Sequence, residues 1–313
     1  MMKEFKPWRR HLTTPYRMLQ TVLMMIFLIV LSLFLNVNCT LPNCYDHAAE
    51  RDSDEVPKKQ LVDSVEEWTD VPKSFDWRQH VVLSTVKNSQ MPNKCQICYA
   101  YAAASTIVDR MIVGNVSHGY AHLYPSIQYI LDCINAGLCI PGGRTLWVYQ
   151  EMIKKAVPDW TCNPFRGYET LCEPIYMCYA CTVPSDIFKC HVVKKAKEFK
   201  IKSYGIVAGE LPMMAEIMTN GPISCAITAT HLFMNYTGGI LFDKYERRAN
   251  YFVEVIGWGE EHVTDVGVVP YWIAKNSFGT FWGEDGFVRI PRSSYKGDEY
   301  TFGIEKDCNF PIV

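Results

Sequence analysis

The sequence has almost no excess of charge of either sign. Its 31 Lys and Arg residues stand against 33 Asp and Glu, and the formal net charge is -2 at pH 7. Nucleic acid is held by a basic field, which this chain lacks, so we do not expect a nucleic-acid partner. Only 20% of the 313 residues are charged and 49% are hydrophobic. This balance excludes disordered and collagen-like chains and allows one large or two small packed domains.

Cysteine, in contrast, is abundant. Thirteen cysteines are many for a cytosolic chain, whose thiols stay reduced, and ordinary for one that folds in an oxidising compartment. We therefore expect residence in the secretory pathway, with a lysosomal or extracellular destination. In such a compartment Asn115 and Asn235, each the first residue of an Asn-x-Ser/Thr sequon, become glycosylation sites.

The N-terminus supports this assignment. A basic stretch precedes an apolar run from about Met18 to Leu35, so residues 1–39 are expected to be a targeting segment. The run is intermediate in length between a signal-peptide core and a minimal membrane span. Either a cleaved signal peptide or an uncleaved signal anchor fits, and only the anchor would attach the chain to a membrane.

Composition divides the remaining chain into two parts. Residues 40–70 are acidic, nearly free of aromatics and without apolar periodicity, which is typical of a short pro-segment or linker. Residues 71–313 form the main body. An Ala-rich stretch without internal Gly or Pro predicts a buried helix from Cys98 to Gly114. Four β-branched and aromatic segments predict strands near 223–230, 252–259, 271–279 and 286–290. The expected fold class is α+β with two packed subdomains.

Three motifs along the body carry a resemblance. Cys95-Gln96-Ile97-Cys98-Tyr99 opens the helix, and Gly257-Trp258-Gly259 and Asn276-Ser277-Phe278-Gly279 follow far downstream. This order resembles the papain-like cysteine peptidases. Within that family the similarity is greatest to the cathepsin X subgroup, also called cathepsin Z, and covers essentially all of 71–313. The resemblance implies a helical left subdomain and a β-barrel-like right subdomain, together rich in disulfides.

The resemblance also assigns catalytic positions. Cys98 matches the nucleophile, and a place at a helix N-terminus would lower its thiol pKa. Asn276 matches the amide that orients the catalytic base. In the family the base His directly follows an Asn and comes several residues ahead of the Gly-Trp-Gly motif. Tyr251 occupies this position in the present chain.

A tyrosine cannot replace that histidine. A phenol of pKa ~10 stays neutral, and an unassisted thiol of pKa ~8.5 is almost entirely protonated at pH 5. Hydrolysis should therefore fall by about three decades or more. His191, His231 and His262 lie downstream of the nucleophile, and we interpret each as an ordinary surface residue.

Other departures concern the oxyanion donor and the groove. The family's oxyanion Gln falls on Ser89 in an ungapped alignment or on Gln90 with a one-residue gap, and either way one family feature is missing. Gln96 and Ile97 are bulky at a place where a substrate must come close. Gly142 and Gly143 resemble the family's groove-lining pair, but they also fit a plain turn.

The cysteines fit a bridged domain. The resemblance implies Cys95–Cys139, Cys133–Cys172, Cys162–Cys178, Cys181–Cys190 and Cys225–Cys308. The resemblance also implies a short pro-segment whose Cys can bond the catalytic thiol, and Cys44-Tyr45 resembles that piece. If signal cleavage removes Cys39, we predict a Cys44–Cys98 bond that blocks the cleft. Elsewhere C-x-x-C denotes a redox dithiol or a zinc ligand pair, but disulfides are favoured in this compartment. We expect no metal or cofactor.

Three functions remain open at this stage. The leading prediction is a catalytically impaired monomeric homologue that binds a peptide or protein through the inherited cleft. The alternative is a weakly active cysteine-type exopeptidase, a carboxypeptidase in lysosomal or extracellular proteolysis. A redox or structural surface protein that uses Cys98 comes third. Whether the chain is an enzyme is thus undecided by sequence.

Overall fold

The computed structural model describes residues 41–47, 71–116, 123–182, 189–245 and 248–313. The expected targeting segment, 1–39, lies outside these ranges. No helix among the described residues has the length and apolar character needed to cross a membrane.

From Cys98 to Phe199 the chain forms a part in which the longer elements are helices. Helix α2 spans Cys98–Val113, as the Ala-rich stretch predicts, and ends where Gly114 N–H bonds to Arg110 O. Its first thirteen residues are buried. The other elements are α3 Ile127–Cys133, α4 Thr145–Lys154, α5 Pro174–Met177, β2 Val157–Pro158, β3 Tyr179–Thr182, β4 Lys189–Val192 and β5 Glu198–Phe199. In this part the strands pair only as two small sheets, β2 with β5 and β3 with β4.

The second part is built on one antiparallel sheet. Its strand order is β10-β9-β8-β7-β11-β6, and β1 pairs with β8 on the side. The strands are β1 Phe75–Asp76, β6 Ser203–Val207, β7 Ile223–Ile227, β8 Tyr251–Val263, β9 Gly267–Lys275, β10 Phe287–Pro291 and β11 Cys308–Ile312. A short 3-10 helix, η2 Trp77–Gln79, and the helices α6 Glu210–Asn220, α7 His231–Met234 and α8 Ser293–Lys296 complete it.

All four predicted strands exist, but their ends differ from the expectation. The strand predicted near 271–279 ends at Lys275, because Asn276 and Ser277 turn away to bond side chain to backbone. Strand β8 runs on to Val263, where it forms a long hairpin with β9.

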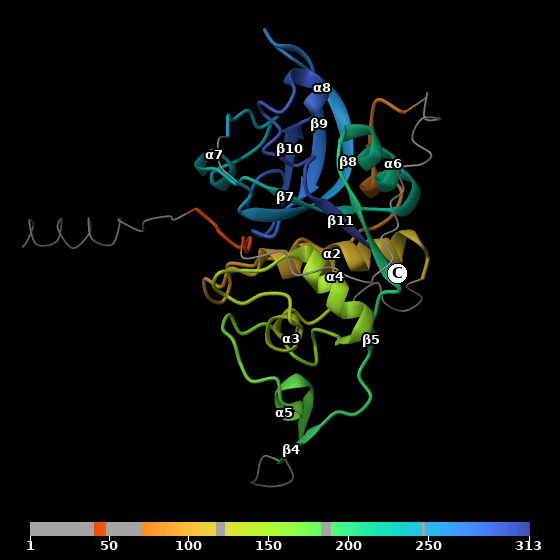
Figure 1. The fold of residues 1–313 in the computed structure, drawn as a ribbon, viewed down its shortest axis with the longest axis vertical. Coiled ribbons are helices and arrows are strands. Elements are labelled where there is room, and N and C mark those ends of the chain that lie inside the picture. The colour runs from red at the N-terminus through yellow and green to blue at the C-terminus, as the bar shows by residue number, and fades with distance from the viewer. Residues whose placement is uncertain (1–40, 48–70, 117–122, 183–188, 246–247) are drawn as a thin grey trace, which may run out of the picture. The chain divides into compact units, whose positions relative to one another are not determined.

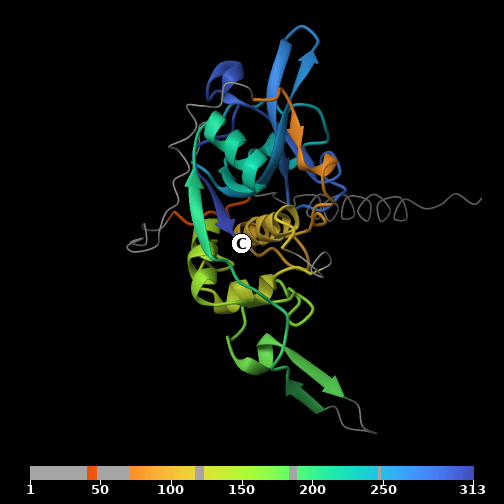
Figure 2. The same ribbon diagram turned by 90° about the vertical axis from the view of Figure 1, so that its right-hand side faces the viewer.

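Helix α2 lies between the two parts. It packs against β8 and β11 on one side and against α3 and α4 on the other (Figures 1 and 2). Buried charges join it to the sheet: Lys275 Nζ on β9 lies 2.5 Å from Asp109 Oδ2 on α2 and 2.9 Å from Glu254 Oε2 on β8. Burial, and then the nearby Asp109 carboxylate, raise the pKa of Glu254. Such a cluster fixes the helix against the sheet only while all its members are paired.

The structure holds six disulfide bonds among the described residues. Five are the pairs that the resemblance implied within the body, and the sixth joins Cys44 to Cys98. Cys95 and Cys98 therefore bond to different partners, and the C-x-x-C does not close on itself. In the described ranges, no group of three or more His, Cys, Asp or Glu side chains is arranged to hold a metal ion.

Candidate active site

Cys98 is the first residue of α2 and is almost completely buried. Its sulfur bonds to Cys44, and the N–H of Phe252 on β8 points at it with an N···S distance of 3.3 Å. The N-terminus of a buried helix and the start of the longest strand thus meet at this sulfur. The positive end of the α2 dipole lies at this sulfur, an effect of about 1 kcal/mol, too small to replace a base.

Tyr251 begins β8, next to Phe252, but its hydroxyl is directed elsewhere. It lies 3.0 Å from the hydroxyl of Ser277, and the ring packs against Phe278 and Phe233 with centroid distances of 5.2 and 5.8 Å. Burial raises the pKa of this phenol well above its usual value. Tyr251 is consequently neutral at physiological pH and cannot take a proton from a thiol.

The hydroxyl of Tyr251 belongs to a small buried network. Ser277 Oγ donates to Ser89 Oγ at 3.1 Å, and Ser89 Oγ donates to the carbonyl of Ser277 at 2.8 Å. Ser89 is buried, whereas Gln90, the other candidate oxyanion donor, is exposed on the surface. Ser277 therefore joins Tyr251 to Ser89, two of the positions where the sequence analysis expects a departure from the family pattern.

Asn276 is buried beside this network, and its side chain hydrogen-bonds to Ser277 rather than to Tyr251. Its Oδ1 accepts a 2.7 Å hydrogen bond from the N–H of Ser277, and no described group hydrogen-bonds to its Nδ2. An unpaired buried amide nitrogen costs free energy. The Asn276 amide therefore bonds to its neighbour Ser277, and its role as an orienting group stays a prediction.

The groove in front of Cys98 is occupied by the chain itself. Gly143 N–H donates to Cys44 O at 3.0 Å, and Asp46 N–H donates to Gly143 O at 3.2 Å. On the other side, Cys44 N–H donates to Asn250 O at 2.9 Å. The stretch 44–46 is bound as an added strand, the way a peptide pairs with a sheet edge.

Gly142 explains why this close approach is possible. Its φ is +104°, and a side-chain Cβ there would stand 2.4 Å from Cys44 O. Only glycine fits both the conformation and the space. The two glycines thus contact the 44–46 stretch directly, and a substrate-groove role for the pair stays a prediction.

Tyr45 anchors the bound stretch. Its ring stacks on Phe252 at 5.2 Å with an interplanar angle of 11°, and its hydroxyl donates to Asp307 Oδ2 at 2.8 Å. Arg144 donates to the same hydroxyl and lies 4.6 Å from the ring centroid. Burial, followed by the charge of Asp307, raises the pKa of Tyr45 to about 12. Tyr45 and Asp307 are 262 residues apart, so no motif spacing pointed to this contact.

The three downstream histidines lie away from the sulfur. His191 is exposed on β4, His231 is exposed at the start of α7, and His262 lies on the exposed end of β8. No described histidine hydrogen-bonds to Cys98. His47, which no sequence motif singles out, has its ring centroid 4.7 Å from that of Tyr45. Asn115 and Asn235, the predicted glycosylation sites, are both exposed.

Comparisons with known proteins agree with this fold. The sequence model described as papain family cysteine protease matches residues 71–312. Cathepsin Z of Onchocerca volvulus is 35% identical over 244 residues, which cover 76% of this chain and 77% of that protein. The bromelain protease of Ananas comosus, solved with an inhibitor, superposes with a TM-score of 0.59 at 26% identity, covering 78% of this chain and all of that one. A cysteine protease of Carica candamarcensis gives a TM-score of 0.60 at 24% identity, covering 77% of this chain and 99% of that one.

The family match over residues 71–312 and the 35% identity to a relative of this family define the class: the chain belongs to the papain family of cysteine proteases. Within that family it is a cathepsin Z-like homologue.

Proposed function

We propose that this chain is a catalytically silent family member that binds a peptide or protein segment in its cleft. The observation that carries the proposal is the direction of the Tyr251 hydroxyl, which bonds to Ser277 and leaves Cys98 without a base. A cysteine peptidase needs a thiolate, a proton acceptor, an orienting group and oxyanion donors. Cys98 and Asn276 occupy two of these positions, and Tyr251 and Ser89 fill the other two with residues unsuited to the task.

The binding half of the site supports the second part of the proposal. Gly143 offers both an N–H and a C=O to an extended chain, and Asn250 offers a carbonyl opposite. These groups presently bind residues 44–46. A foreign peptide can bind to these groups in place of residues 44–46 only after the Cys44–Cys98 bond is broken and Tyr45 leaves its pocket. The cleft is therefore closed in the oxidised, secreted chain and opens when this disulfide is reduced.

Binding can be separated from cleavage in one experiment. A Cys44→Ser/Tyr45→Ala protein, freed of its own segment, is mixed with labelled extended dodecapeptides at pH 5. Polarisation should report binding, and mass spectrometry should show every peptide intact. Oxidised wild-type protein is the matched closed control and should bind none. Cleavage that disappears in a further Cys98→Ser variant would establish an active peptidase instead.

The compartment follows from the same residues. We propose a secretory route to the lysosome or the extracellular space, supported by six disulfides among the described residues and by the exposed asparagines of two sequons, Asn115 and Asn235. Expression in a eukaryotic cell should give a protein whose mass falls on treatment with an N-glycosidase. Removal of both sites, Asn115→Gln and Asn235→Gln, should abolish that shift.

A further inference from the structure

The hairpin of β3 and β4 carries an uncovered apolar face. Tyr179 pairs directly with Val192 and Cys181 with Cys190, so these four side chains point to the same side of the ribbon. The other side carries Lys189 and His191. Tyr179 is 46% exposed and Val192 38% exposed. A two-stranded ribbon needs a partner to bury such a face, and none of the described strands supplies one.

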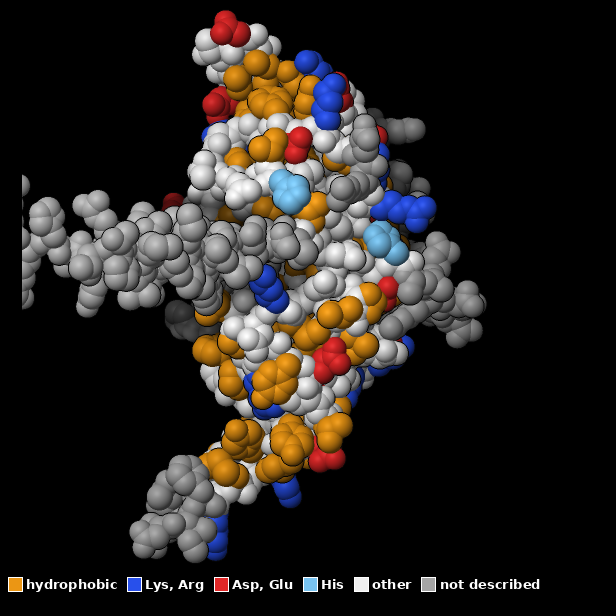
Figure 3. Space-filling model, turned by 90° about the vertical axis from the view of Figure 1, so that its left-hand side faces the viewer, with side chains coloured by type: hydrophobic (Ala, Val, Ile, Leu, Met, Phe, Trp, Pro, Cys, Tyr) orange, Lys and Arg blue, Asp and Glu red, His pale blue; other side chains and the backbone are white. Residues whose placement is uncertain are grey.

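A pocket of about 630 Å³ opens beside this face. We call it the hairpin pocket and define it by Arg166, Tyr168, Leu171, Ile175, Tyr176 and Tyr179. Leu171 is 66% exposed, Tyr168 55% and Tyr176 42%. Figure 3 shows hydrophobic side chains gathered at the lower end of one face of the molecule, over this region. A cluster of exposed apolar side chains of this kind marks an interaction site.

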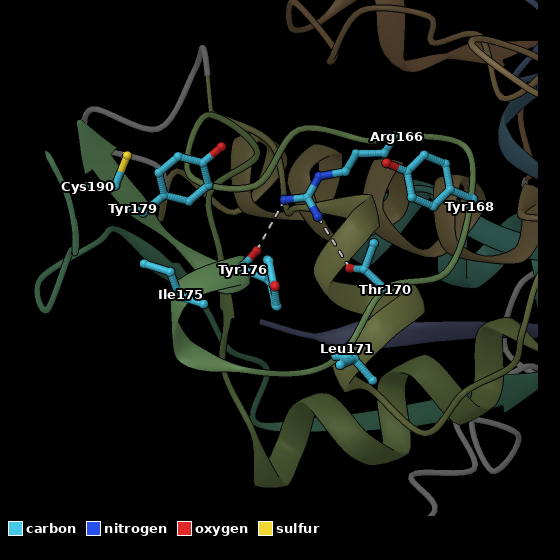
Figure 4. Close-up of a pocket in the computed structure, with 8 residues that line it drawn as sticks. All are labelled: Arg166, Tyr168, Thr170, Leu171, Ile175, Tyr176, Tyr179 and Cys190. Atoms are coloured by element: carbon cyan, nitrogen blue, oxygen red, sulfur yellow. Dashed lines mark hydrogen bonds between the residues drawn. The ribbon is translucent and has the colours of Figure 1, made fainter. Parts of the chain in front are cut away.

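Arg166 gives the hairpin pocket a specific chemistry. Its guanidinium bonds to neutral acceptors only: Asn163 Oδ1 at 3.0 Å, Thr170 Oγ1 at 3.3 Å and the carbonyl of Tyr176 at 3.4 Å. No described carboxylate pairs with it. Figure 4 shows the guanidinium between Tyr179 and Tyr168, with its bonds to Tyr176 and Thr170 dashed. A positioned guanidinium without a carboxylate partner is suited to accept one from a ligand.

The charge next to the hairpin pocket points the same way. Residues 189–195, on β4 and directly after it, contain three lysines, Lys189, Lys194 and Lys195, and no acidic residue. All three lysines are exposed. A partner that contacts this stretch binds more strongly if it carries negative charge. A partner segment along an outer edge of the β3–β4 ribbon also meets backbone N–H and C=O groups that have no strand partner among the described residues.

We propose that the hairpin pocket binds an extended acidic segment of another protein. The segment adds as a strand to the ribbon, inserts an aromatic or aliphatic side chain among the tyrosines, and places a carboxylate on Arg166. Further carboxylates along the segment face Lys194 and Lys195, directly after β4. This surface is separate from the cleft in front of Cys98, and the inference does not depend on the function proposed for that cleft.

The test uses full-chain oxidised protein, in which the cleft is closed. The probe is a labelled ten-residue peptide of alternating glutamate and tyrosine, compared with its glutamine–tyrosine and lysine–tyrosine counterparts. The glutamate peptide should bind in the micromolar range and the other two about 10-fold or more weakly. Arg166→Gln should weaken binding by about 10-fold, and Ile175→Ser by a similar factor. The remote exposed variants Lys296→Gln and Val268→Ser should bind as wild type does.

Several outcomes would overturn the proposal. These are no binding of the glutamate peptide to folded wild-type protein, equal binding of all three peptides, or an Arg166→Gln variant that binds normally. Displacement of the peptide by inorganic polyphosphate with both pocket variants unaffected would show only a nonspecific basic strip. Circular dichroism and intact disulfides verify that each variant is folded.

Discussion

The two walls around Cys98 differ in how well they suit peptidase chemistry. The groove wall, formed by Gly142 and Gly143, binds an extended backbone through direct hydrogen bonds. The opposite wall, formed by Tyr251, Ser277 and Ser89, is a closed network of hydroxyls with a neutral phenol at one end. Binding an extended chain needs only backbone donors, acceptors and space, whereas cleavage needs proton transfer at a fixed position. A chain can lose the second ability and keep the first.

The largest expected effect concerns turnover. With its segment released by Cys44→Ser/Tyr45→Ala, the protein should hydrolyse peptides at pH 5 at least about three decades more slowly than an active papain-like enzyme, because neither thiolate nor proton donor is supplied. A fluorogenic peptide assay alongside commercial papain measures this. Turnover within a factor of ten of papain would erase the difference between the two walls.

Among the changes in stability, we expect the largest at the buried charge cluster of Lys275, Asp109 and Glu254. Lys275→Met leaves Asp109 and Glu254 buried without a cation, which should lower the free energy of unfolding by about 3–5 kcal/mol. The control is Lys306→Met, which removes an exposed pair with Asp298, 2.9 Å apart, and should cost less than about 1 kcal/mol. Urea unfolding compares them, and equal losses would contradict the role of burial.

The groove wall can be tested at Gly142. Gly142→Ala places a Cβ against Cys44 O at a positive φ and should destabilise the docked segment by about 1–3 kcal/mol. Gly267→Ala is the matched control, because its φ is +99° with nothing within 4 Å of the added carbon. Any additional loss in Gly142→Ala then reports the contact itself. Identical unfolding midpoints for the two variants would show that the segment does not press on this glycine.

The smallest effect is expected at Tyr45. Tyr45→Phe keeps the stacking on Phe252 but loses the hydrogen bonds to Asp307 and Arg144. This loss should lower the stability of the docked state by about 1 kcal/mol. Since docking raises the pKa of Tyr45 from 10.0 to about 12, its hydroxyl stabilises the docked state fully below pH 10 and progressively less as pH rises toward 12. The stability gap between wild type and Tyr45→Phe should therefore narrow between pH 10 and pH 12. A constant gap would mean that the phenol is not docked as described.

Local patterns along the chain predicted the elements but not the site's connections. The α2 helix was predictable because the Ala-rich run before Gly114 has a high intrinsic helix propensity, and the strands β7 to β10 were predictable because their β-branched residues cluster. The small strands β1, β2 and β5 have two residues each, too few for a pattern. Their existence depends on tertiary pairing, as with Phe75 opposite Trp258.

The contacts of the site depend on long-range geometry. The motif placed Cys98, Tyr251 and Asn276, but no motif shows that Tyr251 turns its hydroxyl to Ser277, since rotamers follow from packing against Phe278 and Phe233. Arg144, directly after the groove glycines, could have been suspected from its position. Asp307 could not, because the fold alone brings it to Tyr45.

The most direct test of the account is a single substitution at Tyr251. In the Cys44→Ser background, Tyr251→His should pair an imidazole with Cys98 and lower the thiol pKa by several units, each worth about 1.4 kcal/mol. Labelling by an epoxide probe at pH 5.5 should then rise by two decades or more over the Tyr251 parent, while Tyr251→Phe should stay at the parental rate. If folded Tyr251→His protein labels no faster than its parent, Tyr251 does not stand at the base position and the proposed loss of catalysis is contradicted.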